Sequence, residues 1–303
     1  MSKVLITGGR GFVGQYLKEY LENKGHNVYV SSRKNLEEKC IKLNLNNIEE
    51  VEFKLNAEQF DKIFHLSAQS SVAVSFKYPF STMRDNITST INLLEVIHKL
   101  NKKPKLVIAG TSEIYTNKEC PVKESSSLEP RSPYAISKLA TDQFITMMCK
   151  ELKINSTILR LFNHTGPRQA EKFVIPTFSN QLAQIKRGEK EPIIKVGNLG
   201  AERDFTDVRD VLTAYDLVSD REEYGEVYNV CSGKPIKVQY LLDKLIEISG
   251  LNVKIEVDPA RLRPIEIPVY YGNCDKIKNI GWNPIIPIEQ TLKDAYEHWL
   301  KNI

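Results

Sequence analysis

Thr7-Gly8-Gly9-Arg10-Gly11-Phe12-Val13-Gly14 separates the apolar run Lys3–Ile6 from the amphipathic stretch Phe12–Glu22. A buried apolar run, a glycine-rich loop and apolar residues spaced three and four apart indicate a strand, a tight turn and a helix. Gly8 would permit the turn, Gly11 would let the backbone approach a diphosphate, and Gly14 would let the helix pack closely. The helix N-terminus, including Phe12 and Val13, would then offer N–H groups to phosphate oxygens. The segment therefore predicts a dinucleotide site.

The alternation of strand and helix continues through the first half of the chain. Nearly continuous apolar runs, typical of buried parallel strands, occur at Lys3–Ile6, Asn27–Val30, Lys62–Leu66, Lys105–Ala109 and Ser156–Leu161. Helical periodicity is present in Phe12–Glu22, Ser81–Leu100 and Pro133–Leu152. This order predicts an α/β protein with a Rossmann-type, doubly wound parallel sheet.

The rhythm changes after about residue 165, because prolines interrupt shorter elements. We expect residues 1–165 to form a dinucleotide-binding domain and residues 166–303 a smaller, discontinuous substrate-binding lobe. The run Glu226–Val230 has the pattern of one more sheet strand, so a segment near residues 205–232 is expected to return to the first domain.

Composition excludes several classes of partner. The 303 residues include 42 Lys and Arg against 38 Asp and Glu, and the two signs alternate along the chain, which argues against nucleic acid or a membrane as partner. No apolar run approaches the roughly 18 residues of a membrane span, and the start of the chain lacks signal-peptide features, so we expect a cytoplasmic protein. The cysteines form no C-x-x-C pair, so neither a disulfide framework nor a metal site is expected; they are Cys40, Cys120, Cys149, Cys231 and Cys274.

Two further loops refine the expected cofactor. Ser31-Ser32-Arg33 ends the second strand, where NAD enzymes usually carry an acidic residue for the ribose hydroxyls. A guanidinium in place of that carboxylate favours NADP(H) with Ser32 and Arg33 near a 2′-phosphate, although NAD(H) stays open and Arg33 could be a solvated loop residue. His65-Leu66-Ser67-Ala68-Gln69-Ser70 ends another strand, and we expect Leu66, Ser67 and Ala68 to lie against the cofactor. His65 itself is interpreted as a packed or hydrogen-bonded core residue.

A catalytic set follows from Tyr134 and Lys138, which are four residues apart and thus on one face of a helix. A nearby ammonium favours the phenolate form of Tyr, which can exchange a proton with a hydroxyl or carbonyl while a nicotinamide moves a hydride. Taken alone, such a pair is usually a surface pair. Thr111, which follows the fifth strand, would reach the same sheet edge, and Glu113 could be a third acid or base or a structural carboxylate.

Together these motifs resemble the extended short-chain dehydrogenase/reductase family, over nearly the whole chain. The resemblance implies that Thr111, Tyr134 and Lys138 are catalytic, and that Lys138 also contacts the nicotinamide ribose. It further implies cofactor contacts from Asn44, Leu45 and Leu161 and an active-site or substrate role for Gln69 and Asn86. Two positions depart from the family pattern: Thr116 stands where Gly is usual, and Asn44 where Asp is common.

The second half is similar to the GDP-sugar branch of that family, in the stretches Leu161–Pro167, Val196–Asp210 and Arg261–Glu266. The likeness implies that Asn163, Arg203 and Arg263 hold a diphosphate, because an Arg fork matches phosphate oxygens. It also places Glu266 at the guanosine ribose and Val174 at the substrate.

The resemblance implies reduction of a GDP-4-keto-6-deoxy-hexose with NAD(P)H. A GDP-mannose or GDP-heptose 4,6-dehydratase, with Glu113 in the elimination, and a C4 dehydrogenase or epimerase stay open. A non-enzymatic binding module would tolerate loss of the Tyr134 hydroxyl. The family also implies a homodimer through a four-helix bundle of Ser81–Leu100 and Pro133–Leu152.

Overall fold

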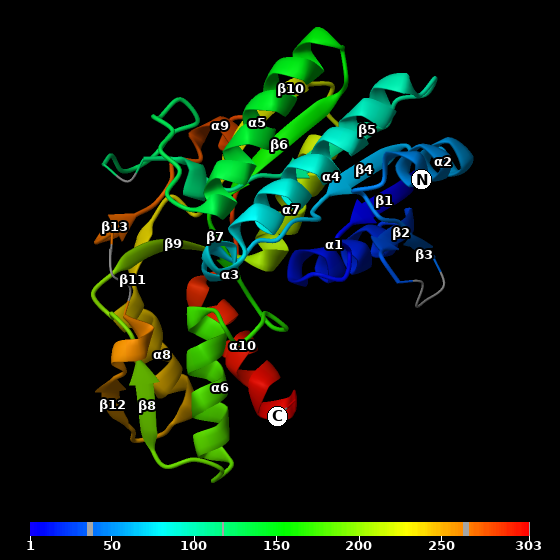
Figure 1. Cartoon of the computed structure of the whole chain (residues 1–303). Helices are drawn as coiled ribbons and strands as arrows, with labels where there is room; N and C mark the ends of the chain where they lie inside the picture. The colour runs from blue at the N-terminus through cyan, green and yellow to red at the C-terminus, as the bar shows by residue number, and fades with distance from the viewer. Residues whose placement is uncertain (35–38, 117, 263–266, 303) are drawn as a thin grey trace. The chain divides into compact units, whose positions relative to one another are not determined.

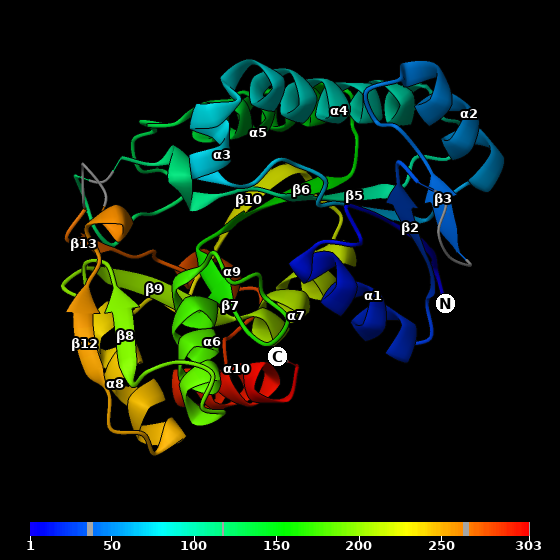
Figure 2. The same ribbon diagram turned by 60° about the horizontal axis from the view of Figure 1, so that its bottom comes forward.

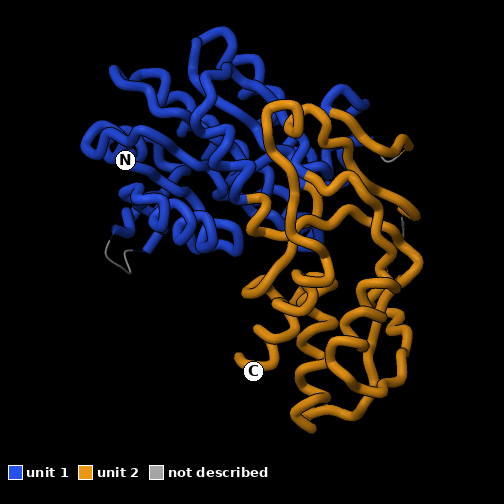
Figure 3. The backbone as a smooth tube through the Cα atoms, turned by 180° about the vertical axis from the view of Figure 1, so that it is seen from behind, with its two compact units in different colours: residues 1–116, 124–161, 212–230 blue, residues 117–123, 162–211, 231–303 orange. Residues whose placement is uncertain are grey.

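The computed structural model describes residues 1–34, 39–116, 118–262 and 267–302. The chain forms two compact units (Figure 3). Unit 1 comprises residues 1–116, 124–161 and 212–230, and unit 2 comprises residues 117–123, 162–211 and 231–303. Within the described residues, unit 1 has one sheet, unit 2 has two, and each unit has its own buried core.

Unit 1 is built on a seven-stranded sheet in the order β10-β6-β5-β4-β1-β2-β3 (Figure 1). Every neighbouring pair is parallel. The strands are β1 (Lys3–Thr7), β2 (Asn27–Ser32), β3 (Cys40–Lys42), β4 (Lys62–His65), β5 (Lys105–Ala109), β6 (Ser156–Leu161) and β10 (Tyr224–Val230). From β1 the strand order proceeds through β2 and β3 in one direction and, starting at its neighbour β4, through β5, β6 and β10 in the other. The carboxyl ends of β1 and β4 are therefore the topological switch point, where sheets of this kind bind ligands. The predicted fold class and the returning strand Glu226–Val230 are confirmed.

Helices cover both faces of this sheet (Figure 2). One face carries α2 (Ile48–Glu58), α3 (Val72–Lys77), α4 (Pro79–Lys99) and α5 (Pro133–Glu151), and the other carries α1 (Phe12–Asn23) and α7 (Val208–Ser219). A short 3-10 turn, η1 (Ser112–Ile114), follows β5. Because strands are buried on both sides, β6 reads as six consecutive buried residues.

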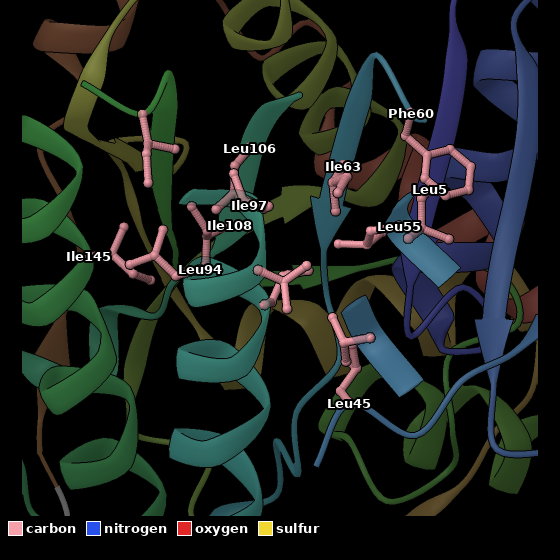
Figure 4. Close-up of a cluster of buried hydrophobic side chains, with 14 of the residues drawn as sticks. Leu5, Leu45, Leu55, Phe60, Ile63, Leu94, Ile97, Leu106, Ile108 and Ile145 are labelled. Atoms are coloured by element: carbon pink, nitrogen blue, oxygen red, sulfur yellow. The ribbon is translucent and has the colours of Figure 1, made fainter. Parts of the chain in front are cut away.

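The core of unit 1 fills the space between the sheet and the α4 and α5 face (Figure 4). Leu5, Ile63, Leu106 and Ile108 project from the strands, and Ile97 comes from α4. Burial of each such side chain contributes roughly 1.5–3 kcal/mol. This packing fixes α4 and α5 on the strands whose ends carry the candidate site.

Unit 2 contains a four-stranded sheet and a two-stranded sheet. The first has β9 (Glu202–Asp207) at its centre, parallel to β7 (Asn163–Thr165) and β13 (Val269–Tyr270) and antiparallel to β11 (Pro235–Lys237). The second pairs β8 (Ile193–Val196) with β12 (Lys254–Val257). The helices α6 (Val174–Lys186), α8 (Val238–Ser249) and α10 (Ile288–Asn302) share one apolar core, which includes Phe178, Leu242 and Leu292. The short helices η2 (Pro259–Arg261) and α9 (Asp275–Lys278) complete the elements of this unit in the described chain.

Candidate active site

The glycine-rich loop has the geometry that the sequence predicts. Gly8 has φ +69°, and the N–H of Gly11 donates to its carbonyl oxygen at 2.9 Å, which closes the turn. A Cβ atom on Gly14 would lie 2.6 Å from the Gly8 carbonyl oxygen, so only glycine allows α1 to start this close to the loop. Gly11 is the N-cap residue and offers no side chain to the first turn, in which no acidic residue occurs. The N-terminal end of α1 therefore suits an anion.

The loop after β4 lies against the glycine-rich loop. A Cβ atom on Gly8 would approach the backbone of Leu66 and Ser67 at 2.9 Å, and the Ser67 N–H donates to the Thr7 hydroxyl at 3.3 Å. These are the loops that flank the β1/β4 switch point. Leu66 and Ser67 are half-buried and Ala68 is exposed. The residues that were predicted to contact the cofactor on this side thus meet at one sheet edge.

Thr111, in the segment between β5 and η1, and Tyr134 of α5 are brought together in the structure. The Thr111 side chain hydrogen-bonds the Tyr134 phenol. Lys138 follows one helical turn later on α5, and all three side chains are buried. Helix α5 begins here because Ser132 is an N-cap whose hydroxyl accepts from the Ala135 N–H at 3.0 Å, and Pro133 occupies the first turn.

The electrostatics of this set differ from the expectation. Burial raises the pKa of Tyr134 to about 12, the hydrogen bond from Thr111 lowers it, and the Glu113 charge raises it. Burial also lowers the pKa of Lys138 to about 8, against the attraction of Asp142. The expected acidic phenol is therefore not found, because removing Tyr134 from water outweighs the hydrogen bond from Thr111. That hydrogen bond, and not the expected Lys138 ammonium, is the interaction that lowers the pKa of Tyr134. The phenol is held in its protonated form at neutral pH.

Glu113 lies two residues after Thr111 in η1, and its backbone N–H donates to the Thr111 hydroxyl at 3.3 Å. Its side chain is exposed, and its charge acts on Tyr134. A carboxylate thus acts electrostatically on the phenol, and it is a candidate for a second acid or base. The catalytic roles of Thr111, Tyr134, Lys138 and Glu113 stay predictions.

Asn86 and Gln69 are engaged with protein groups. The Asn86 carboxamide accepts from the Gln69 N–H at 2.8 Å and donates to Ser137 Oγ at 2.9 Å, between the β4 loop and α5. The Gln69 side chain donates to the Ser71 carbonyl oxygen at 3.0 Å and to Thr82 Oγ1 at 3.3 Å. These bonds are consistent with the role that the resemblance implies for Asn86, which is to hold neighbouring segments of the active site in place. A direct contact of Asn86 or Gln69 with the substrate stays a prediction.

His65 is a buried, hydrogen-bonded residue, as the sequence indicates. Its Nδ1 lies 2.8 Å from Thr7 Oγ1 and its Nε2 lies 3.1 Å from Thr90 Oγ1. Burial and the Lys138 charge lower its pKa to about 3, so the ring is neutral.

The adenosine end of the expected site is exposed. Ser32 ends β2, and its hydroxyl accepts from the Lys34 N–H at 3.2 Å, while the Arg33 side chain lies at the surface. Beyond β3, Asn44 is exposed and accepts from the Asn46 N–H, whereas Leu45 is buried in the core. Leu161, at the end of β6, is also buried.

The predicted substrate residues in unit 2 are partly described. Asn163 starts β7 and is paired with Phe205 of β9, two residues from Arg203. Arg203 Nη1 donates to the Glu202 carbonyl oxygen at 2.8 Å, and Val174 begins α6. Asn163 and Arg203 are thus on adjacent strands of one sheet. Arg263 and Glu266 lie outside the described residues.

The departure at Thr116 is accommodated without glycine. Its φ is not positive, its N–H donates to the Ser127 carbonyl oxygen at 2.8 Å, and its hydroxyl donates to Glu129 at 2.9 Å. The hydroxyl therefore ties the loop after η1 to the strand-like segment near Leu128.

The sequence interpretation missed a buried ionic pair beneath these residues. Asp142 lies one turn beyond Lys138 on α5 and makes two hydrogen bonds with Arg160 of β6, at 2.9 and 2.7 Å. Arg160 also donates to the Tyr115 hydroxyl at 2.8 Å. A single Arg within the buried run Ser156–Leu161 is the signal that could have found it, because a buried charge requires a partner.

Among the described residues, no group of three or more His, Cys, Asp or Glu side chains could hold a metal ion. Within the same ranges, no helix is long and apolar enough to cross a membrane.

Comparisons with known proteins identify sugar-nucleotide enzymes that resemble this chain along its whole length. The chain is 32% identical to GDP-6-deoxy-D-mannose reductase of Pseudomonas aeruginosa over 98% of this chain and 97% of that protein. It is 31% identical to a GDP-mannose 4,6-dehydratase of Vibrio cholerae over 96% of this chain and 91% of that protein. The structure of RMD from Pseudomonas aeruginosa complexed with NADPH superposes with a TM-score of 0.90 at 29% identity, and covers 100% of both chains.

A UDP-glucose 4-epimerase from Thermotoga maritima, solved with UDP-glucose, superposes with a TM-score of 0.89 at 28% identity and covers 99% of both chains. The family model described as GDP-mannose 4,6 dehydratase matches residues 5–295. With the fold and the Thr111, Tyr134 and Lys138 arrangement, this match shows that the chain belongs to the GDP-mannose 4,6 dehydratase family, in the GDP-sugar branch of the extended short-chain dehydrogenases/reductases.

Proposed function

We propose that this protein is an NADPH-dependent reductase of a GDP-4-keto-6-deoxy-hexose. The observation that carries the proposal is the buried Tyr134 phenol, hydrogen-bonded by Thr111 and followed by Lys138 one turn along α5. The names of the Pseudomonas aeruginosa reductase and of its NADPH complex support the choice of substrate and cofactor.

The residues around the glycine-rich loop fit a dinucleotide. Gly8 and Gly14 leave no room for a Cβ atom, and α1 begins at the loop without a side-chain cap. Phe12, Val13, Leu66, Ser67 and Ala68 would line the dinucleotide, Leu45 and Leu161 would back it, and Ser32, Arg33 and Asn44 would hold the adenosine end. When bound, the reduced nicotinamide would supply the hydride.

The side chains of this chain would manage the proton. Reduction adds a hydride to the ketone carbon and a proton to its oxygen, and Tyr134, with its pKa raised to about 12, is protonated and able to donate. Thr111 would hydrogen-bond the same oxygen. The Lys138 cation would then stabilise the resulting phenolate until solvent returns the proton.

Recognition of the substrate is proposed for unit 2. Asn163 and Arg203 would bind the diphosphate with Arg263, Glu266 would bind the guanosine ribose, and Val174 would contact the sugar nucleotide. Gln69 and Asn86 would complete the sugar side from unit 1. In this proposal the two units are the cofactor and substrate domains.

The test is a pair of assays on the purified protein. With NADPH and GDP-4-keto-6-deoxymannose, the wild type is expected to oxidise NADPH and give a product two mass units heavier. Tyr134→Phe should lower kcat by about 10³-fold or more with little change in NADPH affinity. Tyr296→Phe removes a buried phenol hydroxyl elsewhere and serves as the control. Full activity of Tyr134→Phe would overturn the proposal and leave a binding module.

A second candidate is GDP-mannose 4,6-dehydratase, which the exposed Glu113 carboxylate beside Tyr134 favours. Elimination of water between C5 and C6 requires an acid or base beyond the hydride-transfer set. A dehydratase would convert GDP-mannose to a product that has lost water, without net cofactor consumption. Glu113→Gln should abolish that reaction but leave reduction of the keto sugar within about threefold of wild type. Interconversion of C4 epimers in the same assay would indicate an epimerase instead.

We also propose a homodimer formed by α4 and α5, as in the four-helix bundle expected from the family, and a cytoplasmic location. Exposed apolar residues on these helices support the dimer, namely Phe80 of α4 and Ile136 and Met147 of α5.

A further inference from the structure

A continuous chain of hydrogen bonds crosses the interior of unit 1 beneath the candidate site. It starts at the Ser67 N–H, which donates to Thr7 Oγ1 at 3.3 Å, and continues from Thr7 Oγ1 to His65 Nδ1 at 2.8 Å. His65 Nε2 is 3.1 Å from Thr90 Oγ1, which donates to the Asn86 carbonyl oxygen at 2.9 Å. The chain thus joins β1, β4 and α4.

The Asn86 side chain extends the chain to α5. Its amide group donates to Ser137 Oγ at 2.9 Å, and the Ser137 hydroxyl donates to the Tyr134 carbonyl oxygen at 2.7 Å. Thr7 directly precedes the glycine-rich loop, and Ser137 directly precedes Lys138. One end of this series of hydrogen bonds therefore lies next to the glycine-rich loop, and the other lies next to Tyr134 and Lys138 on α5. His65, Thr90 and Ser137 are all buried, so water does not compete for these bonds.

The bonding pattern fixes the proton on the histidine ring. The one hydroxyl hydrogen of Thr90 is used toward the Asn86 carbonyl oxygen, so Thr90 must accept from His65, and Nε2 carries the ring proton. In a neutral ring Nδ1 is then an acceptor, so the Thr7 hydroxyl donates to it. This leaves Thr7 Oγ1 as an acceptor for the Ser67 N–H, which is the bond observed. Each of these hydrogen bonds thus has one donor and one acceptor, and the assignments agree with one another.

We propose that His65, as its neutral Nε2–H tautomer, is a positioning residue that couples the cofactor loop to the Tyr134 and Lys138 helix. The inference rests on the proposed reductase function for its kinetic test. A histidine suits this place because its two ring nitrogens accept on one side and donate on the other at a fixed separation. The groups that face the ring are Thr7 from β1, Thr90 from α4 and the Lys138 cation from α5, and that cation disfavours a second ring proton.

The first test removes the Thr90 hydroxyl, which accepts from His65 and donates to the Asn86 carbonyl oxygen. Thr90→Val leaves the shape nearly unchanged but removes both bonds. We expect the loss of the His65 bond to lower kcat roughly five- to tenfold, with KM and NADPH affinity within about twofold of wild type. Ser89→Ala is the matched control, because Ser89 also donates to the Asn86 carbonyl oxygen, at 3.3 Å, but lies outside the His65 chain. Thr90→Ser should restore kcat. Equal losses in Thr90→Val and Ser89→Ala would overturn the proposal.

The second test measures coupling between the two ends. Thr7→Val and Ser137→Ala alter residues that do not bond each other, so independent effects on kcat should multiply. If the series of hydrogen bonds couples the two residues, the fall in kcat of the double variant is at least threefold smaller than the product of the two single falls. When Thr90→Val is also present, the effects of Thr7→Val and Ser137→Ala on kcat should become multiplicative. Multiplicative effects in the wild-type background would reject the coupling.

The third test needs no turnover and therefore stands apart from the proposed function. Nitrogen-15 NMR of the labelled histidines should show one ring with a protonated Nε2 and a bare Nδ1, unchanged between about pH 5 and pH 8, and Thr90→Val should shift its signals. If the enzyme assays fail but this NMR result is obtained, the proposed reductase function is rejected while the assignment of the Nε2–H tautomer of His65 stands. A His65 ring that titrates in this range, or that carries its proton on Nδ1, would overturn the inference.

Discussion

Lys138 is a buried residue whose charge is opposed by its surroundings. Burial lowers its pKa from 10.5 to about 8, although Asp142 acts in the opposite direction. Between about pH 8 and pH 10.5 the unfolded chain therefore binds more protons at this site than the folded protein. The stability of the folded state should rise with pH across that window, and below about pH 8 the full penalty applies.

We predict that Lys138→Met is more stable than wild type at about pH 7 by roughly 2–3 kcal/mol, because the buried charge is gone. The difference should shrink toward zero as the pH rises to about 10.5. Urea unfolding of both proteins across this pH range measures it. Lys150→Met, at an exposed position of the same helix, is the control and should show no such trend. A difference that is independent of pH would show that Lys138 is not destabilised by burial.

Arg33 is the residue on which we expect cofactor preference to depend. It is exposed at the end of β2, and we predict that Arg33→Ala weakens NADPH binding roughly ten- to a hundredfold, the effect of one lost charge-assisted contact. NADH binding should change by less than about threefold, because NADH has no 2′-phosphate. Titration of both cofactors by fluorescence or calorimetry tests this, with the exposed Arg84→Ala as control. Equal losses for both cofactors would mean that Arg33 acts on something other than the 2′-phosphate.

At the scale of elements, α5 presents Tyr134, Lys138 and Asp142 at intervals of four, so a single helical face carries the phenol, the ammonium and the carboxylate. The carboxylate binds Arg160 of β6 through two hydrogen bonds, and Arg160 binds the Tyr115 hydroxyl next to η1. One guanidinium thus connects the helix, the strand and the turn that carry the candidate catalytic residues.

We predict that Asp142→Asn lowers the free energy of unfolding by roughly 3–5 kcal/mol, because it leaves the Arg160 charge buried without a counterion. The double variant Asp142→Leu with Arg160→Met should lose less stability than Asp142→Leu or Arg160→Met alone, since no charge stays buried. Urea unfolding measures the free energy of unfolding of each variant. As a control, Arg221→Met breaks the more exposed pair with Glu223 and should cost about 1 kcal/mol or less. Additive losses in the double variant would show that the two residues act separately.

The elements also show where sequence reasoning succeeds. The strands and helices of the first half were predicted to within about two residues at most ends, because buried parallel strands and amphipathic helices have distinct periods. Strand β3 and helix α2 gave weaker patterns, since three residues show no period and Ile48–Glu58 buries only Val51 and Leu55.

The candidate site was predicted less completely. Spacing placed Tyr134 and Lys138 on one helical face, because an interval of four is local. Their proposed catalytic role needed Thr111 and the family resemblance in addition. The sign of the Tyr134 pKa shift was not predictable, since it depends on burial by segments far away in the chain. The partners of Arg160 and His65 come from separate elements as well, so no spacing in the sequence reveals them.

At the scale of the whole molecule, the proposed dimer depends on the outer faces of α4 and α5. On α5 the exposed positions Ile136, Ala140, Gln143 and Met147 follow one another at intervals of three and four and carry no charge. On α4, Phe80 is exposed, and Met83, Ile87 and Ile91 are half-buried at helical spacing. The two helices pack side by side on the same face of the unit 1 sheet (Figure 2), so the stripes adjoin. Adjoining apolar stripes of this kind mark association surfaces.

We therefore predict a homodimer in which α4 and α5 pack on the same helices of a second copy, since a two-fold axis brings a patch onto itself. Met147→Glu places two like charges near each other and in an apolar contact, and should weaken association by roughly a hundredfold or more. Light scattering at micromolar concentration is expected to give a dimer for the wild type and a monomer for Met147→Glu. Lys301→Glu, which introduces the same residue at an exposed position of α10, should stay dimeric. A wild-type monomer at that concentration would leave the stripes without the partner proposed here.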